Sequence, residues 1–113
     1  MKHYMLFIRE DLDAARQMTE EQLQADIQLM IQWVETLSKG GHYVQGEPLE
    51  PESLLARKDS IASDGAFIET KEGISGYVII QAETLQQAGE LAQQCPLMDQ
   101  TVKSIEVRPI LKF

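Results

Sequence analysis

The residues best suited to chemistry lie between positions 64 and 77. Two candidate bases, Glu69 and Glu72, lie close to a cation, Lys71. Side chains alternate between the two sides of an extended segment, so Glu69 and Lys71 point one way and Glu72 the other. At the mouth of a cavity, Lys71 can hold an anionic ligand and either glutamate can act as a base. The other ligand-binding candidates in this stretch are Asp64, Gly65, Phe67 and Tyr77.

The same charges also have a purely structural interpretation. Asp64 and Gly65 form a typical turn, and Glu69, Lys71 and Glu72 can form ion pairs that fix a hairpin. Such pairs contribute only ~0–1 kcal/mol when they are exposed. Because local ion-pair networks resemble functional sites, the sequence leaves both interpretations open.

The chain has two histidines, a residue type that often serves as an acid or a base. His42 opens an expected strand beside two glycines and could form the lip of a pocket, so it is a catalytic candidate besides Glu69 and Glu72. His3 shares a strand face with Met5. A structural role is favoured for both histidines. Neither has the spacing of a metal-ligand pair, so no metal site and no cofactor are predicted.

The single cysteine, Cys95, is expected at the C-terminal end of a helix. The partial negative charge at that end disfavours a thiolate. Its spacing from Leu91 instead places it among the apolar residues of the helix. Cys95 is therefore predicted to be a small core residue rather than a nucleophile.

Composition excludes several classes of function. The chain of 113 residues carries a net charge of −8 and has a calculated pI near 4.6. Nucleic acids and anionic membranes are bound through lysine and arginine, so neither is an expected partner. The apolar runs are too short to span a bilayer. With one cysteine and no signal-peptide pattern, the prediction is a soluble cytoplasmic protein.

Four strands and a hairpin are expected from the apolar pattern. The runs at residues 4–8 and 77–80 are continuously apolar, as in strands buried on both faces. The weaker runs at 42–45 and 104–108 suit edge strands, and Pro109 follows the last one. Between the second and third strands, residues 53–58 and 61–63 can form the arms of a hairpin that turns at 59–60.

Two amphipathic helices separate these strands. Thr19 and Gln22 form a capping-box pattern, and Gly40–Gly41 stop the helix. Thr84 and Gln87 repeat the capping pattern, residues 11–17 form a polar connection, and Pro96 ends the second helix. The residues expected to face inward are Leu23, Ile27, Met30, Val34 and Leu37 in the first helix, and Leu85, Ala88, Leu91, Ala92 and Cys95 in the second.

This order predicts a single α+β domain over residues 1–113. It is a ferredoxin-like βαββαβ fold with an extra hairpin, in which two helices cover one face of a four-stranded antiparallel sheet. Both central strands are apolar on both faces, so the uncovered face is too apolar for a monomer. A homodimer packed through the open face of the sheet is the expected remedy, and a monomer with a deep apolar groove on that face is the alternative.

The chain closely resembles the DGPF group of the YCII-related family. The resemblance rests on Asp64-Gly65-Ala66-Phe67 followed by Glu69-Thr70-Lys71-Glu72, with Ala66 where the family pattern has proline. It extends from the strand at residues 1–9 to Val107-Arg108-Pro109. The resemblance implies a dimeric α/β barrel and no established reaction.

In the family branch that lacks this motif, a histidine midway along the first helix and an aspartate before the proline of the second are proposed as acid and base. The corresponding positions here are Leu29 or Met30, and Cys95. Neither can transfer a proton as that pair would. The resemblance therefore does not carry this mechanism to the present chain.

The sequence is compatible with two functions that belong to different classes. The first is an enzyme that acts on a small aromatic or anionic metabolite in a cavity between sheet and helices. The second is a non-catalytic module that binds a small ligand or accompanies a regulator, as the resemblance to DGPF proteins implies. The cavity residues expected for the first function are Met30, Trp33, Tyr43, Phe67 and Tyr77, although core packing is an alternative for each.

Overall fold

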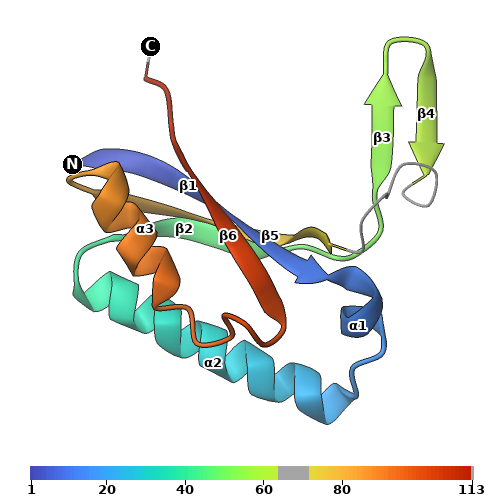
Figure 1. Cartoon of the computed structure of the whole chain (residues 1–113), viewed down its shortest axis with the longest axis horizontal. Helices are drawn as coiled ribbons and strands as arrows, with labels where there is room; N and C mark the ends of the chain where they lie inside the picture. The colour runs from blue at the N-terminus through green and yellow to red at the C-terminus, as the bar shows by residue number, and fades with distance from the viewer. Residues whose placement is uncertain (64–71, 113) are drawn as a thin grey trace.

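The computed structural model of the chain describes residues 1–63 and 72–112. Its elements follow one another in the order predicted by the sequence, with one additional short helix (Figure 1). They are β1 (Lys2–Asp11), α1 (Leu12–Arg16), α2 (Glu20–Lys39), β2 (Tyr43–Pro48), β3 (Leu54–Arg57), β4 (Ser60–Ser63), β5 (Glu72–Ala82), α3 (Leu85–Gln93) and β6 (Val102–Pro109).

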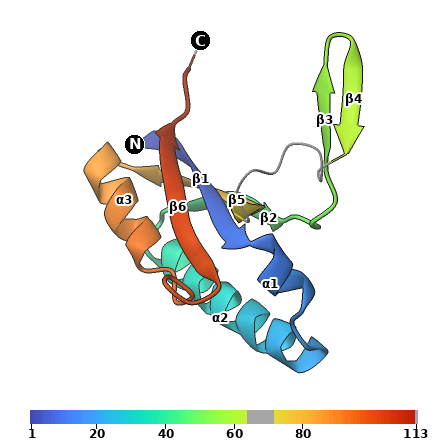
Figure 2. The ribbon, with the colours of Figure 1, turned by 45° about the vertical axis from the view of Figure 1, so that its right-hand side comes forward.

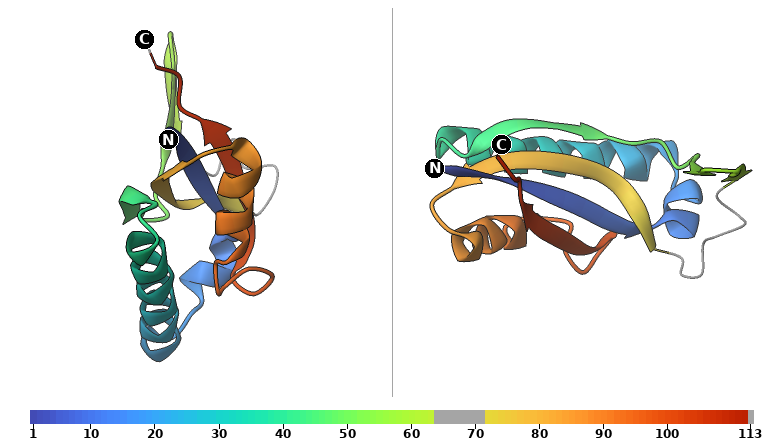
Figure 3. Two further views of the ribbon diagram at one scale, coloured as in Figure 1. Left: turned by 90° about the vertical axis from the view of Figure 1, so that its left-hand side faces the viewer. Right: turned by 90° about the horizontal axis from the view of Figure 1, so that it is seen from above.

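The main sheet has four strands in the order β2-β5-β1-β6, and all neighbouring strands are antiparallel. The two continuously apolar strands, β1 and β5, are therefore central, and the proline at position 109 ends an edge strand, as predicted. The long helix α2 runs beneath the sheet, and α3 lies beside it on the same side (Figures 1 and 3). These features confirm the ferredoxin-like α+β fold.

Strand alternation divides the central strands into two faces. Leu6 of β1 and Val78 of β5 are cross-strand partners, and both are buried toward the helices. Their neighbours Phe7 and Ile79 point to the opposite face, where they are only half-buried. Since α2 and α3 lie on the other side, no described helix covers this open face, which is the side expected to meet a second copy.

The long helix α2 begins and ends as its sequence predicts. The Thr19 hydroxyl accepts the backbone N–H of Gln22, and the Gln22 side chain accepts that of Thr19. At the other end, Gly41 has a φ of 77°, a left-handed conformation that glycine adopts without a steric cost. Both ends are thus encoded locally.

The predicted apolar stripe of α2 is only partly buried. Trp33 and Leu37 lie in the core, whereas Leu23, Ile27 and Ile31 remain 40–44% exposed. The apolar face predicted by the sequence is therefore buried in the C-terminal half and partly exposed in the N-terminal half. There the helix lies beside an open groove instead of packed side chains.

Three local predictions also need correction. The predicted polar connection at 11–17 contains a short helix, α1 (Leu12–Arg16), whose first turn is capped by the Asp11 carboxylate, which accepts the backbone N–H of Ala14 at 3.1 Å. The second strand is longer than residues 42–45 and runs to Pro48. Only half of the second capping box forms, since the Gln87 side chain accepts from Glu83 instead of Thr84.

The second short helix covers the sheet through its small residues. Ala88 and Ala92 of α3 and the following Cys95 are buried, as predicted. Leu85 is half-exposed, because it stands in the first turn of the helix at the margin of the sheet, so its predicted inward position was wrong. The core role of Cys95 is confirmed by its burial.

The predicted hairpin is present as β3 and β4. Ala56 pairs with Ile61 and Arg57 with Ser60, so the turn lies one residue earlier than predicted. The two strands pair with each other and form a separate sheet that stands away from the main one (Figures 1 and 2).

Candidate functional site

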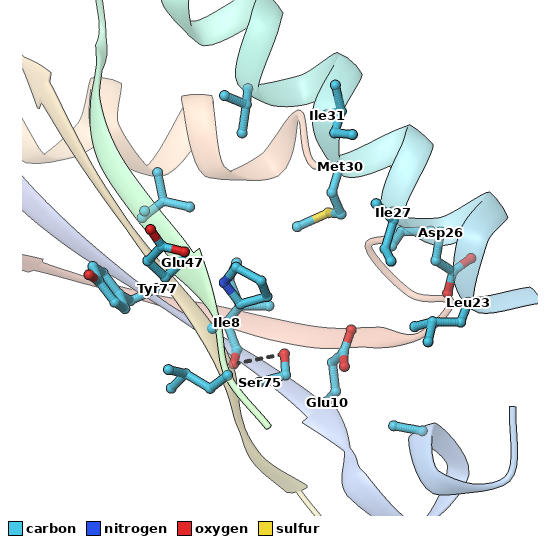
Figure 4. Close-up of a pocket in the computed structure, with 18 of the residues that line it drawn as sticks. Ile8, Glu10, Leu23, Asp26, Ile27, Met30, Ile31, Glu47, Ser75 and Tyr77 are labelled. Atoms are coloured by element: carbon cyan, nitrogen blue, oxygen red, sulfur yellow. Dashed lines mark hydrogen bonds between the residues drawn. The ribbon is translucent and has the colours of Figure 1, made fainter. Parts of the chain in front are cut away.

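A groove of about 440 Å³ lies between the N-terminal half of α2, the short helix α1 and the ends of β1, β2 and β5 (Figure 4). Its volume is in the range of small-molecule sites. The apolar walls come from separate elements of the fold. They include Ile8, Leu12, Met18, Ile27, Met30, Ile31, Pro48 and Leu49.

The local sequence explains why this groove is open. Met18 and Leu12 belong to the chain segment that turns from β1 into α2, and this segment holds the start of α2 away from the sheet (Figure 1). Gly46 and Gly76 line the opposite wall without side chains. A Cβ atom at Gly46 would lie 2.7 Å from the Tyr77 carbonyl oxygen, so the close approach of β2 and β5 requires glycine there.

Glu10 of β1 is one of the acidic residues that line this groove. Burial among apolar side chains raises the pKa of its carboxyl above the ordinary 4.5, a hydrogen bond from Ser75 lowers it, and the nearby Asp26 carboxylate raises it. The Ser75 hydroxyl lies also 3.5 Å from the Ile8 carbonyl oxygen, and its single proton can serve only one acceptor well at a time. Desolvation therefore dominates, and Glu10 is a carboxyl that holds its proton more strongly than usual.

The raised pKa of Glu10 has a consequence for stability. The folded protein favours the protonated carboxyl, so the contribution of Glu10 to the free energy of unfolding is fully present below the ordinary pKa of 4.5 and is lost as pH rises through the folded-state pKa. Glu10→Gln is expected to remove this fall and to unfold at a higher denaturant concentration than wild type at pH 7. Urea titrations from pH 3 to pH 8 measure the effect; equal pH slopes for both proteins would contradict it.

Two sulfur atoms meet behind the groove. The Cys95 thiol lies 3.7 Å from the Met30 thioether, and Met30 also lines the groove. Burial raises the pKa of the Cys95 thiol, so the thiolate is scarce near neutral pH. This contact joins α2 to the segment after α3 without providing an acid or a base.

A comparison with protein-family models finds a match to the YCII-related domain over residues 2–113. The chain belongs to the YCII-related family. No curated protein matches the chain. In this YCII-related protein, Met30 and Cys95 bring together two sulfur groups that do not exchange protons at neutral pH.

The structure places the predicted cavity residues in different parts of the fold. Met30 and Tyr43 line the groove. Tyr77 contributes to its edge, but strand alternation directs its side chain to the open face together with that of its partner Glu47 (Figure 4). Trp33 lies in the core, and its indole N–H donates to the Leu91 carbonyl oxygen at 3.2 Å.

Most of the candidate residues in the motif at 64–72 fall in the part of the chain that the structure does not describe. Asp64, Gly65, Phe67, Glu69 and Lys71 lie outside the described residues. Glu72 is the first residue of β5 and pairs with Asp11.

His42, the remaining catalytic candidate, lies between α2 and β2, and its Nδ1 is 2.8 Å from the Gln81 carbonyl oxygen. It is not a residue of the groove. This contact matches the structural role that the sequence favoured.

Sequence reasoning missed the polar residues of the groove, Glu10, Asp26 and Ser75. A signal for Asp26 was present, because it follows Leu23 by three residues and precedes Met30 by four, which places an acid within the apolar stripe of α2. Glu10 likewise follows the inward residues Leu6 and Ile8 at even spacing along β1.

Two further observations concern metal ions and membranes. Within residues 1–63 and 72–112, no three histidine, cysteine, aspartate or glutamate side chains gather as a metal site would require. Among the helices described, none has the length and apolar character needed to cross a membrane.

Proposed function

We propose that this domain binds a small, mainly apolar molecule in the groove and that Glu10 exchanges a proton with it. The observation that carries the proposal is the position of Glu10, a carboxyl with a raised pKa inside an apolar groove that is open to solvent. Groups that act as general acids or bases are tuned in this way by burial. Ile8, Met30 and Tyr43 supply surfaces on which an aromatic ring can pack.

The charges of the groove favour a neutral or cationic molecule. The ionisable side chains that line it include Glu10, Asp26 and Glu35, and no lysine or arginine of the described chain is among them. Carboxylates repel an anion in a site of low polarity. The anion-binding role expected for Lys71 remains a prediction that concerns residues outside the described part.

A non-catalytic binding role is the second candidate. It is favoured by the resemblance to the other family branch, whose acid and base correspond to Leu29 or Met30 and to Cys95 in this chain, because none of these side chains transfers a proton as that pair would. The two candidates differ at Glu10. An enzyme needs its proton, whereas a binding module needs only its shape and hydrogen bond.

We also propose that the chain is a cytoplasmic homodimer of the DGPF group. Supporting this assembly, Met5 and Phe7 of β1 and Tyr77 and Ile79 of β5 share the face of the sheet that lacks a helix. The motif from Asp64 to Glu72 supports the subgroup. A dimer through this face leaves the groove free, because the groove lies on the helix side.

The proposed site is tested by a thermal-shift screen of neutral, cationic and anionic aromatic compounds against the wild-type protein. A neutral or cationic compound is expected to raise the unfolding temperature, and Glu10→Gln is expected to lower its affinity about tenfold, because a hydrogen bond to a charged group contributes roughly 1.5–3 kcal/mol. Glu83→Gln, at an exposed position before α3, is the matched control. An anion whose effect disappears in Lys71→Ala would overturn the proposal.

The apolar wall is tested by Ile27→Ser. Its side chain is 40% exposed at the groove, so the substitution is expected to weaken ligand binding roughly five- to tenfold while costing under about 1.5 kcal/mol of stability. Leu85→Ser on α3 removes a comparably exposed side chain away from the groove and is expected to leave binding unchanged. Isothermal titration calorimetry with the best compound of the screen makes the comparison. Equal losses in both variants would exclude the groove as the binding site.

Catalysis is tested separately from binding. For a bound compound with an acidic C–H group, wild type is expected to accelerate exchange of that hydrogen for deuterium in D2O, and Glu10→Gln to slow it at least a hundredfold, the scale of a general base. One-dimensional NMR follows the exchange. Binding without accelerated exchange would leave the non-catalytic role as the correct one.

A further inference from the structure

The β3–β4 hairpin stands apart from the rest of the chain that the structure describes. It rises from the sheet on the side away from α2 (Figures 1 and 3). Its two four-residue strands pair with each other in a sheet of their own. A two-stranded hairpin without packing partners is only marginally stable in water. The hairpin therefore needs a surface that stabilises it.

One face of the hairpin is apolar and exposed. Ala56 and Ile61 are cross-strand partners, and Leu54 lies two residues before Ala56, so these three side chains share a face. Leu54 and Ile61 are each 71% exposed. A single exposed aliphatic residue is ordinary, but two on the same face of an unsupported hairpin indicate a contact surface.

The shape of the chain agrees with an arm that reaches outward. Its radius of gyration is 15.1 Å, compared with about 13 Å for a compact domain of this length. The arm extends toward the side of the open sheet face, away from α2 (Figure 3). A second copy packed on that face would lie beside the hairpin.

Charge supports a second copy of this chain as the partner. Arg57 and Lys58 lie at the turn of the hairpin, and neither forms a salt bridge with another described residue. With Asp59 in the same turn, the tip keeps a net charge of +1, whereas the whole chain carries −8, so the tip is opposite in charge to another copy. Complementary charges of this kind guide association and fix orientation.

We propose that the hairpin clasps the second subunit, with Leu54 and Ile61 packed against it and Arg57 and Lys58 facing its acidic surface. This inference rests on the homodimer proposed above and adds a second contact region to it. The open sheet faces of the two subunits form the centre of the dimer interface, and each hairpin contacts the other subunit at the periphery of that interface.

A photo-crosslinking experiment tests the clasp directly. The photoreactive residue benzoylphenylalanine is placed at position 61 of the full chain, and irradiation is expected to yield covalent dimers. The same residue at position 85, half-exposed on α3, is expected to yield none. If light scattering shows a dimer but position 61 gives no covalent dimer, the clasp is wrong and the homodimer stands. If the protein is a monomer, both proposals are wrong.

A substitution experiment measures what the clasp contributes. The double variant Leu54→Ser/Ile61→Ser is expected to raise the dimer dissociation constant at least tenfold while leaving the circular dichroism of the main domain unchanged. Leu85→Ser is the control, and sedimentation equilibrium gives the constants. An unchanged dissociation constant would overturn the clasp, and the separate effect of Phe7→Asp on the same constant would show whether the sheet face holds the dimer.

Discussion

Phe7→Asp is expected to convert the homodimer into an unstable monomer. Phe7 stands on central strand β1 and points to the open face, because its neighbours Leu6 and Ile8 are buried toward the helices. The proposed interface removes on the order of 800 Å² per subunit from water, and its apolar part contributes roughly 25 cal/mol per Å². A carboxylate at its centre would lose its hydration without a partner, at a cost of at least about 2 kcal/mol per subunit.

The measurement combines light scattering with thermal unfolding over a range of protein concentrations. The wild-type midpoint is expected to rise with concentration, since association stabilises the folded state by mass action. For Phe7→Asp the midpoint is expected to be lower and independent of concentration. Gln28→Asp, on the exposed side of α2, introduces the same charge outside the interface and should behave as wild type. A monodisperse wild-type monomer at micromolar concentration, with a constant midpoint, would show that the open face is covered in another way.

The direction of Phe7 illustrates what the sequence could and could not predict. The run from Tyr4 to Ile8 is apolar at every position, so it identifies a central strand but not which side faces the helices. Packing decides which side faces the helices. Leu6 and Val78, partners on neighbouring strands, are the residues buried on the helix side of the sheet. Topology was predictable because it depends on the order of patterns. Strand orientation depends on contacts between elements far apart in the sequence.

The groove was less predictable than the fold for a related reason. An apolar residue at helical spacing looks the same whether it fills a core or lines a cavity, so Leu37 and Ile27 were given the same role. The structure buries Leu37 and leaves Ile27 beside open space. The difference arises because α1 separates the start of α2 from the sheet, and α1 itself was missed. Glu10 and Asp26 become notable only once their two elements are brought together.

Trp33→Ala is expected to have the largest effect of any single substitution in the helix layer. Trp33 is 3% exposed and connects α2 to α3, and its indole N–H donates to the Leu91 carbonyl oxygen at 3.2 Å. Removing a buried aromatic side chain costs about 3–5 kcal/mol, because the cavity that remains collapses only in part. That is a large share of the 5–15 kcal/mol typical of a domain. Urea denaturation followed by circular dichroism measures the loss, since the variant has no tryptophan fluorescence.

Trp33→Phe separates packing from hydrogen bonding at this position. The Leu91 carbonyl also accepts the backbone N–H of Gln94 at 3.2 Å, so losing the indole donor leaves it with a partner. The phenylalanine variant should therefore lose about 1 kcal/mol for the bond and a further part for the smaller ring. Its total loss should remain well below that of alanine. If Trp33→Phe and Trp33→Ala were equally destabilised, the hydrogen bond to α3, and not the packed ring, would be what Trp33 contributes to the fold.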